Sequence, residues 1–583
     1  MKYSNIPAAQ LLVLSCKSAG IKDIIISPGS RNAPLTLSFT GDPFFDCYSI
    51  VDERCAAFFG LGIAQQKNEP VALVCTSGSA LLNYYPAIAE AFYSNIPLIV
   101  ISADRPPYKI DVGDGQTIRQ DNVFDRHIGC SCTLKMDVEH ARERLSFYRP
   151  DYLGQTQRSI QEFNTDQIST SFRIALEERL PVHINVPFEE PLYGLETVEG
   201  TEFSFDWDTY GENGITSHMA AIQKSWNASP RKMVLVGVNT PNTINTRFLE
   251  HLAQDSSVMV FTETTSNLHH PNFFPSIDSI LFPIEKSADP HQRFLDLQPE
   301  ILLTFGGLVV SKKIKAFLRK YKPKEHWHVH PTKGYDTFFA LTQYVKEEPN
   351  RFLERLCSNA KTVSSTYCKD WQAIRKRYET KQLEYVKKAP FSDFSVFEAL
   401  QVAVPMGYQV HLSNSSTVRY AQLFPLGDSI PVYCNRGTSG IDGSTSTAIG
   451  ASIHYKGPTL LITGDLSFFY DSNAMWNNYI RNDFRIIVIN NSGGGIFRIL
   501  PGFDDSERFG TFFETQHQMT AEHSCKQFGW EYRSSDNLES FKDELYSFFE
   551  TGNSPKLLEV FTPRELNNTI LLGYFDFISS EYQ

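Results

Sequence analysis

TLLITGDLSFF (459–469) and FRIIVINNSGGG (484–495) are the stretches that decide the fold of the C-terminal part of the chain. Each contains a short β-branched run that ends in glycine and polar residues, which is typical of a buried strand in a parallel sheet. The spacing predicts two parallel strands joined by a helix at about 471–481, with Asp465 and Asn491 at their carboxyl ends. Open α/β sheets bind ligands beyond the carboxyl ends of their strands, so this edge is a candidate site.

A carboxylate and an amide oxygen at this edge suit a hard divalent cation. Mg²⁺ takes six oxygens and shares its shell with phosphate and water rather than with a full protein cage. The candidate metal ligands are therefore Asp465, Asn491 and a backbone carbonyl near Gly493. Glycines let the backbone come close to a diphosphate, and N–H groups at the start of a helix can hold this anion. The glycines at this edge are Gly464, Gly493, Gly494 and Gly495. Taken alone, the same pattern fits simple strand termination.

Alternation of short β-branched runs with helical patterns continues along the whole chain, which indicates an α/β fold. With 583 residues the chain is too long for one hydrophobic core. We expect three consecutive doubly wound parallel-sheet domains at residues 1–190, 191–375 and 376–583, with a linker at about 188–230. The other expected strands are 23–27, 71–77, 97–103, 181–187, 233–239, 257–263, 301–307, 326–331, 408–414, 431–436 and 556–562.

Composition limits the classes of function. The charged fraction of 21% and the hydrophobic fraction of 42% are ordinary for a folded protein, and the net charge of −12 disfavours nucleic-acid binding. No apolar run approaches the roughly 20 residues of a membrane span, and the apolar residues 11–16 fit a helix better than an export signal. The ten cysteines lack paired metal-ligand spacing. We expect a cytoplasmic protein with reduced thiols.

A second candidate lies near the N-terminus, where Asp52-Glu53-Arg54 precede the apolar helical stretch AAFFGLGIAQQ (56–66). A glutamate at a helix start often only complements the helix dipole. The functional alternative is specific to thiamine chemistry. A buried carboxylate that hydrogen-bonds the aminopyrimidine ring favours the imino tautomer, which removes the C2 proton of the thiazolium, and burial raises the carboxylate pKa enough to share that proton.

The DER segment, TSGSALLNYYPAIAEAFYSNIPLIVISADRP (76–106) and the two C-terminal strands together resemble the thiamine-diphosphate-dependent decarboxylase and carboligase superfamily. The resemblance covers essentially the whole chain. It implies a pyrimidine-binding domain, a central scaffold domain and a diphosphate-binding domain in that order, with thiamine diphosphate and Mg²⁺ (or Mn²⁺ in its place) as cofactors. It also implies a homodimer or homotetramer with the site at the subunit interface.

Longer motifs narrow the resemblance to one family: SPGSRNAPL (27–35), GQTIRQ (115–120), NRGTSGIDGSTSTAIG (435–450) and NNSGGGIF (490–497). They resemble the MenD family of menaquinone biosynthesis, the 2-succinyl-5-enolpyruvyl-6-hydroxy-3-cyclohexene-1-carboxylate synthases. The resemblance implies decarboxylation of 2-oxoglutarate on thiamine diphosphate and 1,4-addition of the succinyl carbanion/enamine to isochorismate, with release of CO₂. Leu466 stands where most of the superfamily has glycine, and the menaquinone enzymes accommodate leucine there.

The family's substrates carry several carboxylates, which the planar fork of arginine binds well. The resemblance assigns substrate binding to Ser30, Arg31, Arg105, Gln116, Lys312, Arg419, Arg436, Ile496 and Phe497. It assigns cofactor binding to Glu53, Ile441, Gly464, Asp465, Leu466, Ser467, Asn491 and Gly493, with Glu53 catalytic and with Asp465, Asn491 and Gly493 at the metal. Each arginine taken alone also fits an ordinary surface residue with solvated partners.

Two other functions fit part of this pattern. Another carboligase of the superfamily would keep Glu53, Asp465 and Asn491 without needing the SPGSR segment or the arginines. A catalytically silent thiamine-diphosphate-binding scaffold would not need Glu53. The central region contains no G-x-G-x-x-G motif, and neither His127 nor the His269-His270 pair receives a role from its spacing.

Overall fold

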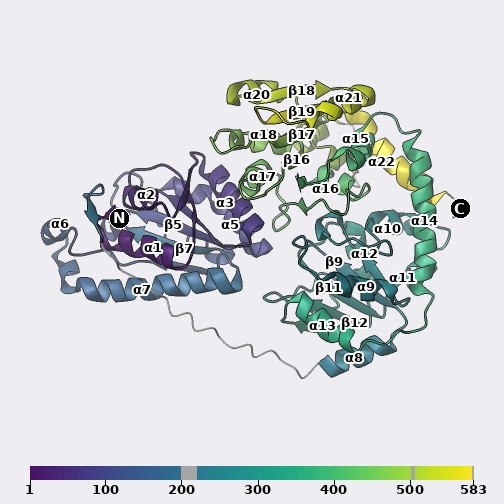
Figure 1. Ribbon diagram of the computed structural model, residues 1–583, viewed down its shortest axis with the longest axis horizontal. Helices are drawn as coiled ribbons and strands as arrows, with labels where there is room; N and C mark the ends of the chain where they lie inside the picture. Colours follow the sequence, from purple (N-terminus) through teal and green to yellow (C-terminus); the bar gives the residue numbers. More distant parts are fainter. Residues whose placement is uncertain (199–218, 500–505, 581–583) are drawn as a thin grey trace. The chain divides into compact units, whose positions relative to one another are not determined.

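A computed structural model describes residues 1–198, 219–499 and 506–580, so residues 199–218 of the predicted linker lie outside the described residues. The described strands form three large parallel sheets and one antiparallel pair of β1 (Lys2–Ser4) with β8 (Leu195–Thr197) (Figure 1). The chain divides into two compact units. Unit 1 comprises Met1–Tyr210, Gly437–Thr459 and Ser467–Phe484, and unit 2 comprises Gly211–Arg436, Leu460–Leu466 and Arg485–Gln583.

The N-terminal sheet has six parallel strands in the order β3-β2-β4-β5-β7-β6. Its strands are β2 (Asp23–Ile26), β3 (Asp46–Ser49), β4 (Val71–Cys75), β5 (Leu98–Asp104), β6 (Cys130–Thr133) and β7 (Val182–Pro187). The four strands expected from the sequence are confirmed. The two that were missed, β3 and β6, are the sheet edges, and their sequences DCYS and CSCT lack an apolar run because edge strands are only partly buried.

The helices of this region follow the strands in regular alternation. They are α1 (Pro7–Ser18), α2 (Ala33–Thr40), α3 (Glu53–Lys67), α4 (Ser79–Asn83), α5 (Tyr85–Ser94), α6 (Arg142–Tyr148) and α7 (Gln157–Arg173). The apolar residues 11–16 lie inside α1, as expected, and seven residues of α1 are buried. Among the described residues, no helix is both long and apolar enough to cross a membrane.

The middle sheet belongs to unit 2 and has five parallel strands in the order β10-β9-β11-β12-β13. They are β9 (Lys232–Val236), β10 (Val258–Phe261), β11 (Ile301–Phe305), β12 (Glu325–Val329) and β13 (Gln343–Val345). The switch point of this order lies between β9 and β11, where open sheets bind ligands. Here the two loops touch through their backbones, because a Cβ on Gly237 would lie 1.9 Å from the carbonyl oxygen of Gly307.

The C-terminal sheet has the order β15-β14-β16-β17-β19-β18. Its strands are β14 (Gln409–Leu412), β15 (Val432–Tyr433), β16 (Thr459–Gly464), β17 (Phe484–Asn490), β18 (Glu531–Ser535) and β19 (Lys556–Phe561). Numbered within each sheet, the N-terminal and C-terminal sheets have the same strand order, 2-1-3-4-6-5. Each therefore has its switch point between its first and third strands, β2 and β4 in one sheet and β14 and β16 in the other.

The helix predicted at about 471–481 is wrong. The helix α18 spans Asp465–Tyr470, a 3-10 turn covers Ser472–Met475, and no helix follows before β17. Side chains here bond the backbone in competition with helix formation. The Asp471 carboxylate accepts the Ser446 N–H at 2.7 Å, and the Asn477 side chain accepts the Tyr479 N–H at 2.9 Å.

Within unit 1, the apolar helix α3 packs against α17 (Ser444–Ser452) through closely approaching backbones. A Cβ on Gly62 would lie 2.0 Å from the carbonyl oxygen of Thr447, and a Cβ on Gly450 would lie 2.0 Å from that of Phe59. Only glycine allows such an approach. The glycines of the two sequence motifs thus let α3 bury its apolar residues and fix its N-terminal end.

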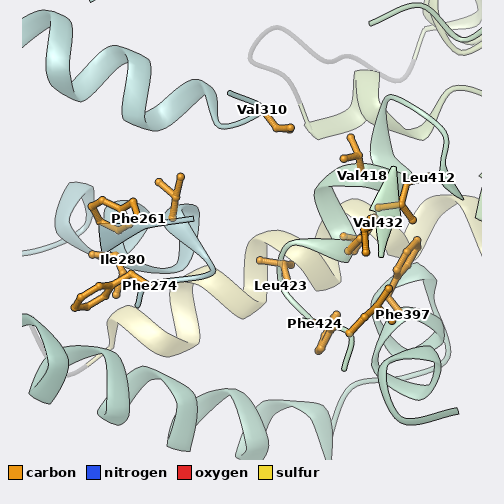
Figure 2. Packing of buried hydrophobic residues seen from close by; sticks show 14 of the residues in the cluster. Phe261, Phe274, Ile280, Val310, Phe397, Leu412, Val418, Leu423, Phe424 and Val432 are labelled. Atoms are coloured by element: carbon orange, nitrogen blue, oxygen red, sulfur yellow. The ribbon is translucent and has the colours of Figure 1, made fainter. Parts of the chain in front are cut away.

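Unit 2 is held together by one hydrophobic core that both of its sheets share. Figure 2 shows Phe261, Phe274 and Ile280 from the middle region and Leu412, Val418 and Val432 from the C-terminal region. The helices of unit 2 include α8 (Met219–Ala228), α9 (Thr246–Gln254), α10 (Ile277–Glu285), α11 (Pro290–Leu297), α12 (Lys312–Lys320), α13 (Pro349–Ser358), α14 (Tyr367–Val386), α15 (Asp393–Ala403), α16 (Ser416–Ala421), α20 (Glu522–Phe528), α21 (Leu538–Phe548) and α22 (Arg564–Ser579). The shared core explains why the middle and C-terminal sheets form one unit.

Candidate cofactor and substrate site

Glu53 is the first residue of α3 and is partly buried. The helix is capped by its neighbour Asp52, whose side chain accepts the Cys55 N–H at 3.1 Å, so Glu53 is not needed as a cap. Within the described ranges, the Glu53 carboxylate has no hydrogen bond or ion pair. Burial chiefly, and the Glu53 charge in addition, raise the pKa of the Cys75 thiol and of the Tyr84 hydroxyl. A carboxylate that is partly desolvated and has no protein partner can accept a hydrogen bond from a ligand.

Two predicted arginines meet at the carboxyl edge of the N-terminal sheet. Arg31, which follows β2, is 2% exposed and donates to the Phe188 carbonyl at 3.1 Å and to Glu190 at 3.2 Å. Burial, followed by the positive charge of Arg105, lowers the pKa of Arg31. The Nε atoms of both arginines are buried without a hydrogen-bond partner in the described structure. Neighbouring guanidinium groups with unpaired N–H donors are suited to binding an anion.

The other predicted residues of this sheet edge lie at its surface. Ser30 and Gln116 are both exposed, and Gln116 has a positive φ of 56°. The Gln116 backbone lies against Gly78, in the turn after β4, since a Cβ on Gly78 would be 3.6 Å from the Gln116 carbonyl oxygen. The nearby Gln120 is buried and accepts the Gly78 N–H at 2.9 Å, so it has a structural role.

The predicted metal edge lies at the carboxyl ends of the C-terminal sheet in unit 2. Asp465 is 2% exposed; its Oδ1 accepts the Leu466 N–H at 2.7 Å and its Oδ2 accepts the Gly493 N–H at 2.9 Å. The Gly464 N–H donates to Ser413, which follows β14, at 3.2 Å. Polar groups that follow β14, β16 and β17 are therefore hydrogen-bonded to one another, and Asp465 and Asn491 directly follow β16 and β17, as the sequence predicted.

Asn491 gives the clearest indication that this edge suits a cation. Its amide nitrogen donates to Asp393 at 3.1 Å, whereas its Oδ1 is buried with no hydrogen-bond partner in the described structure. A buried amide oxygen without a partner is costly. Asp465 and the Asn491 oxygen are the oxygen donors that Mg²⁺ prefers, so the residues fit the expected ion. The described ranges contain no group of three or more histidine, cysteine or acidic side chains suited to a metal, so a cation at this edge would depend on amide, backbone, phosphate or water oxygens in addition to Asp465.

A cluster of buried charges lies in unit 2 around two further predicted arginines. Arg436 donates to Asn414 at 2.6 Å, and the pKa of Arg419 is lowered by burial and raised in part by Asp278. The Arg419 Nε is buried without a hydrogen-bond partner in the described structure. Glu263 accepts the N–H groups of Val310 and Ser311 at 2.7 and 2.8 Å, which ties the loop before α12 to this cluster.

Lys315 joins this cluster, whereas the predicted Lys312 is exposed at the first position of α12. Burial, opposed by Glu263, lowers the pKa of Lys315, and Arg436 and Arg419 add to the lowering. The sequence analysis did not single out Lys315, Glu263 or Asp278. A signal was available in the run KKIK, because lysines are unfavourable at a helix N-terminus unless another charge compensates them.

The remaining predicted residues occupy loops within their own units. In unit 1, Ile441 is 38% exposed and its carbonyl accepts the Ser467 hydroxyl at 2.6 Å. In unit 2, Ile496 and Phe497 are partly buried in a 3-10 turn at Gly495–Ile499, and Phe497 packs edge-on against Phe513. His127, which received no predicted role, bonds the Tyr85 hydroxyl at 2.9 Å.

Known proteins match the chain over its full length. Residues 6–125 match the family model described as thiamine pyrophosphate enzyme, N-terminal TPP binding domain. A relative from Christiangramia forsetii is 49% identical over 100% of both chains, and one from Flavobacterium johnsoniae is 50% identical over 99% of both. A third, from Porphyromonas gingivalis, is 36% identical over 99% of this chain and 98% of its own. All three are named 2-succinyl-5-enolpyruvyl-6-hydroxy-3-cyclohexene-1-carboxylate synthase.

The chain belongs to this synthase family. Membership confirms the resemblance drawn from the sequence motifs and decides against other carboligase families.

Proposed function

We propose that this synthase-family chain decarboxylates 2-oxoglutarate on thiamine diphosphate and joins the remaining four-carbon unit to isochorismate by 1,4-addition. The products are 2-succinyl-5-enolpyruvyl-6-hydroxy-3-cyclohexene-1-carboxylate and CO₂. The proposal is carried by two observations: the partly buried Glu53 carboxylate has no hydrogen-bond partner among the described residues, and Arg31, Arg105 and Arg419 each have a buried Nε atom without one. The named relatives support the same reaction.

Thiamine diphosphate would supply the carbon acid whose conjugate base attacks the keto carbon and stabilises the charge left by decarboxylation. Asp465, the Asn491 oxygen and the Gly493 carbonyl would hold its diphosphate through Mg²⁺. Glu53 would accept a hydrogen bond from the aminopyrimidine ring and keep a proton at that nitrogen. Ile441, an exposed apolar side chain on a loop whose backbone is bonded by Ser467, would pack against the cofactor.

The substrates would be held by charge and by shape. Arg31 and Arg105 have buried Nε donors without a partner in the described structure at one sheet edge, and Arg419 has another in unit 2, where Arg436 and buried Glu263 lie close by. Arginine forks bind carboxylates in a fixed orientation, which places the reacting carbons and lowers the entropic cost of the addition. Ile496 and Phe497 would form an apolar wall that keeps water from the reacting carbon.

We propose further that two copies of the chain build each site, with Glu53 from one subunit and the metal edge from another, in a dimer or a tetramer. We also place the enzyme in the cytoplasm. The support is that all ten cysteines are free thiols, as expected in a reducing compartment.

Product analysis tests the reaction. The purified protein is incubated with thiamine diphosphate, Mg²⁺, 2-oxoglutarate and isochorismate, and the product is identified by mass spectrometry. Parallel reactions omit isochorismate or replace 2-oxoglutarate with pyruvate. The succinyl adduct is expected only with both native substrates. Equal use of pyruvate, or release of CO₂ without the adduct, would show that the substrate assignment is wrong.

A further inference from the structure

Asp393, the first residue of α15, is a buried hydrogen-bond centre that the proposed reaction does not itself require. It is 3% exposed. Its Oδ1 accepts the Thr562 hydroxyl at 2.6 Å and the Asn567 amide at 2.9 Å, while its Oδ2 accepts the Asn491 amide at 3.1 Å. Its backbone N–H donates back to the Asn567 side chain at 2.8 Å. Residues from α15, the end of β19 and α22 thus fix the carboxylate in place.

The bond from Asn491 decides which end of that amide faces the cofactor edge. An asparagine side chain has a donating nitrogen and an accepting oxygen, which are interchangeable by rotation about χ2. Here the nitrogen is committed to Asp393, so the oxygen points away from Asp393, and it has no partner among the described residues. Gly495 closes on the same amide, since a Cβ there would lie 3.1 Å from the Asn491 nitrogen.

The carboxylate of Asp393 permits only one of the two orientations of the Asn491 amide. An ionised carboxylate only accepts hydrogen bonds, so it attracts the amide nitrogen and repels the amide oxygen. An asparagine at position 393 could present either the oxygen or the nitrogen of its own amide. It would therefore no longer determine which end of the Asn491 amide faces it. Partners that orient a metal ligand in this way typically affect metal affinity by about 10–100-fold when they are removed.

We propose that Asp393 is a positioning residue that holds Asn491 with its oxygen directed at the divalent cation. This inference rests on the proposed function, because it takes the cation to bind at Asp465 and Asn491. Asp393 itself touches neither cofactor nor substrate in this proposal. Its contribution is the orientation of a ligand 98 residues away in the sequence.

The test measures metal binding directly. Mn²⁺ replaces Mg²⁺, and free Mn²⁺ is counted by electron paramagnetic resonance during titration of the full-length protein with saturating thiamine diphosphate. Asp393→Asn is expected to weaken Mn²⁺ binding by about 10–100-fold. Thr562→Val is the matched control, because it removes a hydrogen bond to the other carboxylate oxygen and leaves the Asn491 bond intact. It is expected to bind Mn²⁺ within about threefold of wild type.

A polarity swap provides a second and independent measurement. Asn491→Asp alone places two carboxylates about 3 Å apart and is expected to bind Mn²⁺ poorly because like charges repel. Adding Asp393→Asn lets the new amide donate to the new carboxylate, and is expected to recover at least about tenfold of the affinity. A merely structural role for Asp393 predicts no such rescue.

The possible results distinguish a failure of the inference about Asp393 from a failure of the proposed function. Saturable Mn²⁺ binding by wild type that is equalled by Asp393→Asn would overturn the inference and leave the proposed function standing. An equal loss in Thr562→Val, or a double variant no better than Asn491→Asp, would also overturn it. Absence of thiamine-diphosphate-dependent Mn²⁺ binding by wild type would instead count against the proposed function. If Asp393→Asn fails to fold, as judged by its Tm without cofactor, the inference is tested by comparing the Mn²⁺ affinities of Asn491→Asp and of the double variant.

Discussion

Asp465, the residue directly after β16, accepts the backbone N–H of Gly493, which lies just beyond β17, at 2.9 Å. This bond joins the two motifs that the sequence offered as a metal site. It also holds Gly493 at a φ of 148°, where a Cβ would lie 2.7 Å from the Glu514 carbonyl oxygen. Glycine is therefore required at this position for the loop to close on Asp465.

The same bond restricts what Asp465 can do. A carboxylate has about four lone-pair positions, and the backbone N–H groups of Leu466 and Gly493 occupy two of them. His517 lies 3.2 Å from the same Oδ2. Oδ1 therefore keeps an open position for a cation, and its orientation is fixed before any ligand arrives.

Glu53→Gln is expected to lower kcat by at least about 100-fold, because glutamine cannot hold the proton that the carboxylate shares with the cofactor ring. The Kd for thiamine diphosphate, measured by quenching of tryptophan fluorescence, is expected to stay within about threefold, since the diphosphate and the metal supply most of the binding. Asp52→Asn is the control: asparagine also caps a helix, so its kcat should remain close to wild type. A Glu53→Gln enzyme of normal kcat would remove Glu53 from the mechanism.

Arg419→Lys is expected to raise the KM for one of the two substrates by about 10–100-fold, the loss that follows from a charged hydrogen bond of about 1.5–3 kcal/mol. Lysine keeps the charge but cannot present the planar fork. Steady-state kinetics with each substrate varied in turn would identify the affected one. Arg247→Lys, on α9 and paired with Glu354 at the surface, serves as the control. An unchanged KM for both substrates would show that Arg419 has a structural role and does not bind either substrate.

Sequence reasoning located the interior strands well because parallel strands that are buried on both faces give continuous apolar runs. It missed four of the six edge strands of the large sheets, which are partly exposed and have mixed polarity: β3, β6, β13 and β18. The edge strands β10 and β15 were predicted. It also misplaced the helix after β16, since the competing bonds of Asp471 reach Ser446, which is remote in sequence. The same strand order in the first and last sheets could not be predicted, because pairing order depends on contacts that leave no local pattern.

Candidate site residues could be proposed from the sequence where a motif contains them, and not where only the fold brings them together. Asp465, Asn491 and Gly493 lie in short motifs at strand ends. Asp393 is hydrogen-bonded to Asn491, which lies 98 residues away in the sequence, and no pattern in the residues around Asp393 predicts this contact. Lys315 and Lys312 differ by three positions on one helix, and only the helix's packing makes one half-buried and leaves the other exposed.

Gly62→Ala is expected to destabilise the protein by about 1–3 kcal/mol, because the new Cβ would lie 2.0 Å from the Thr447 carbonyl oxygen and would force α3 and α17 apart. The apparent Tm at a fixed scan rate would fall, and kcat would fall with it if α3 places Glu53. Gly154→Ala is the matched control, since a Cβ there meets nothing within 4 Å. Equal Tm values for the two variants would show that the helices can separate at little cost.

The pKa of Glu263 leads to a prediction about how the stability of the protein depends on pH. Burial raises its pKa from the ordinary 4.5 to about 7, against the opposing effect of two backbone N–H donors. The folded state therefore keeps this proton up to about pH 7, while the unfolded chain releases it near pH 4.5. Between those values the folded state binds more protons, so the contribution of Glu263 to stability falls as pH rises, and it is constant above about pH 7.

Glu263→Gln removes this titration while keeping the size of the side chain. We expect the difference in Tm, wild type minus Glu263→Gln, to decrease steadily between pH 4.5 and 7 and to level off above that range. Scanning both proteins at fixed rate and ionic strength cancels the other titrating groups, because all of them are common to the two chains. A difference in Tm that is the same at every pH would mean that Glu263 titrates alike in both states, and the buried charge cluster around Arg436 would then have to stabilise its ionised form.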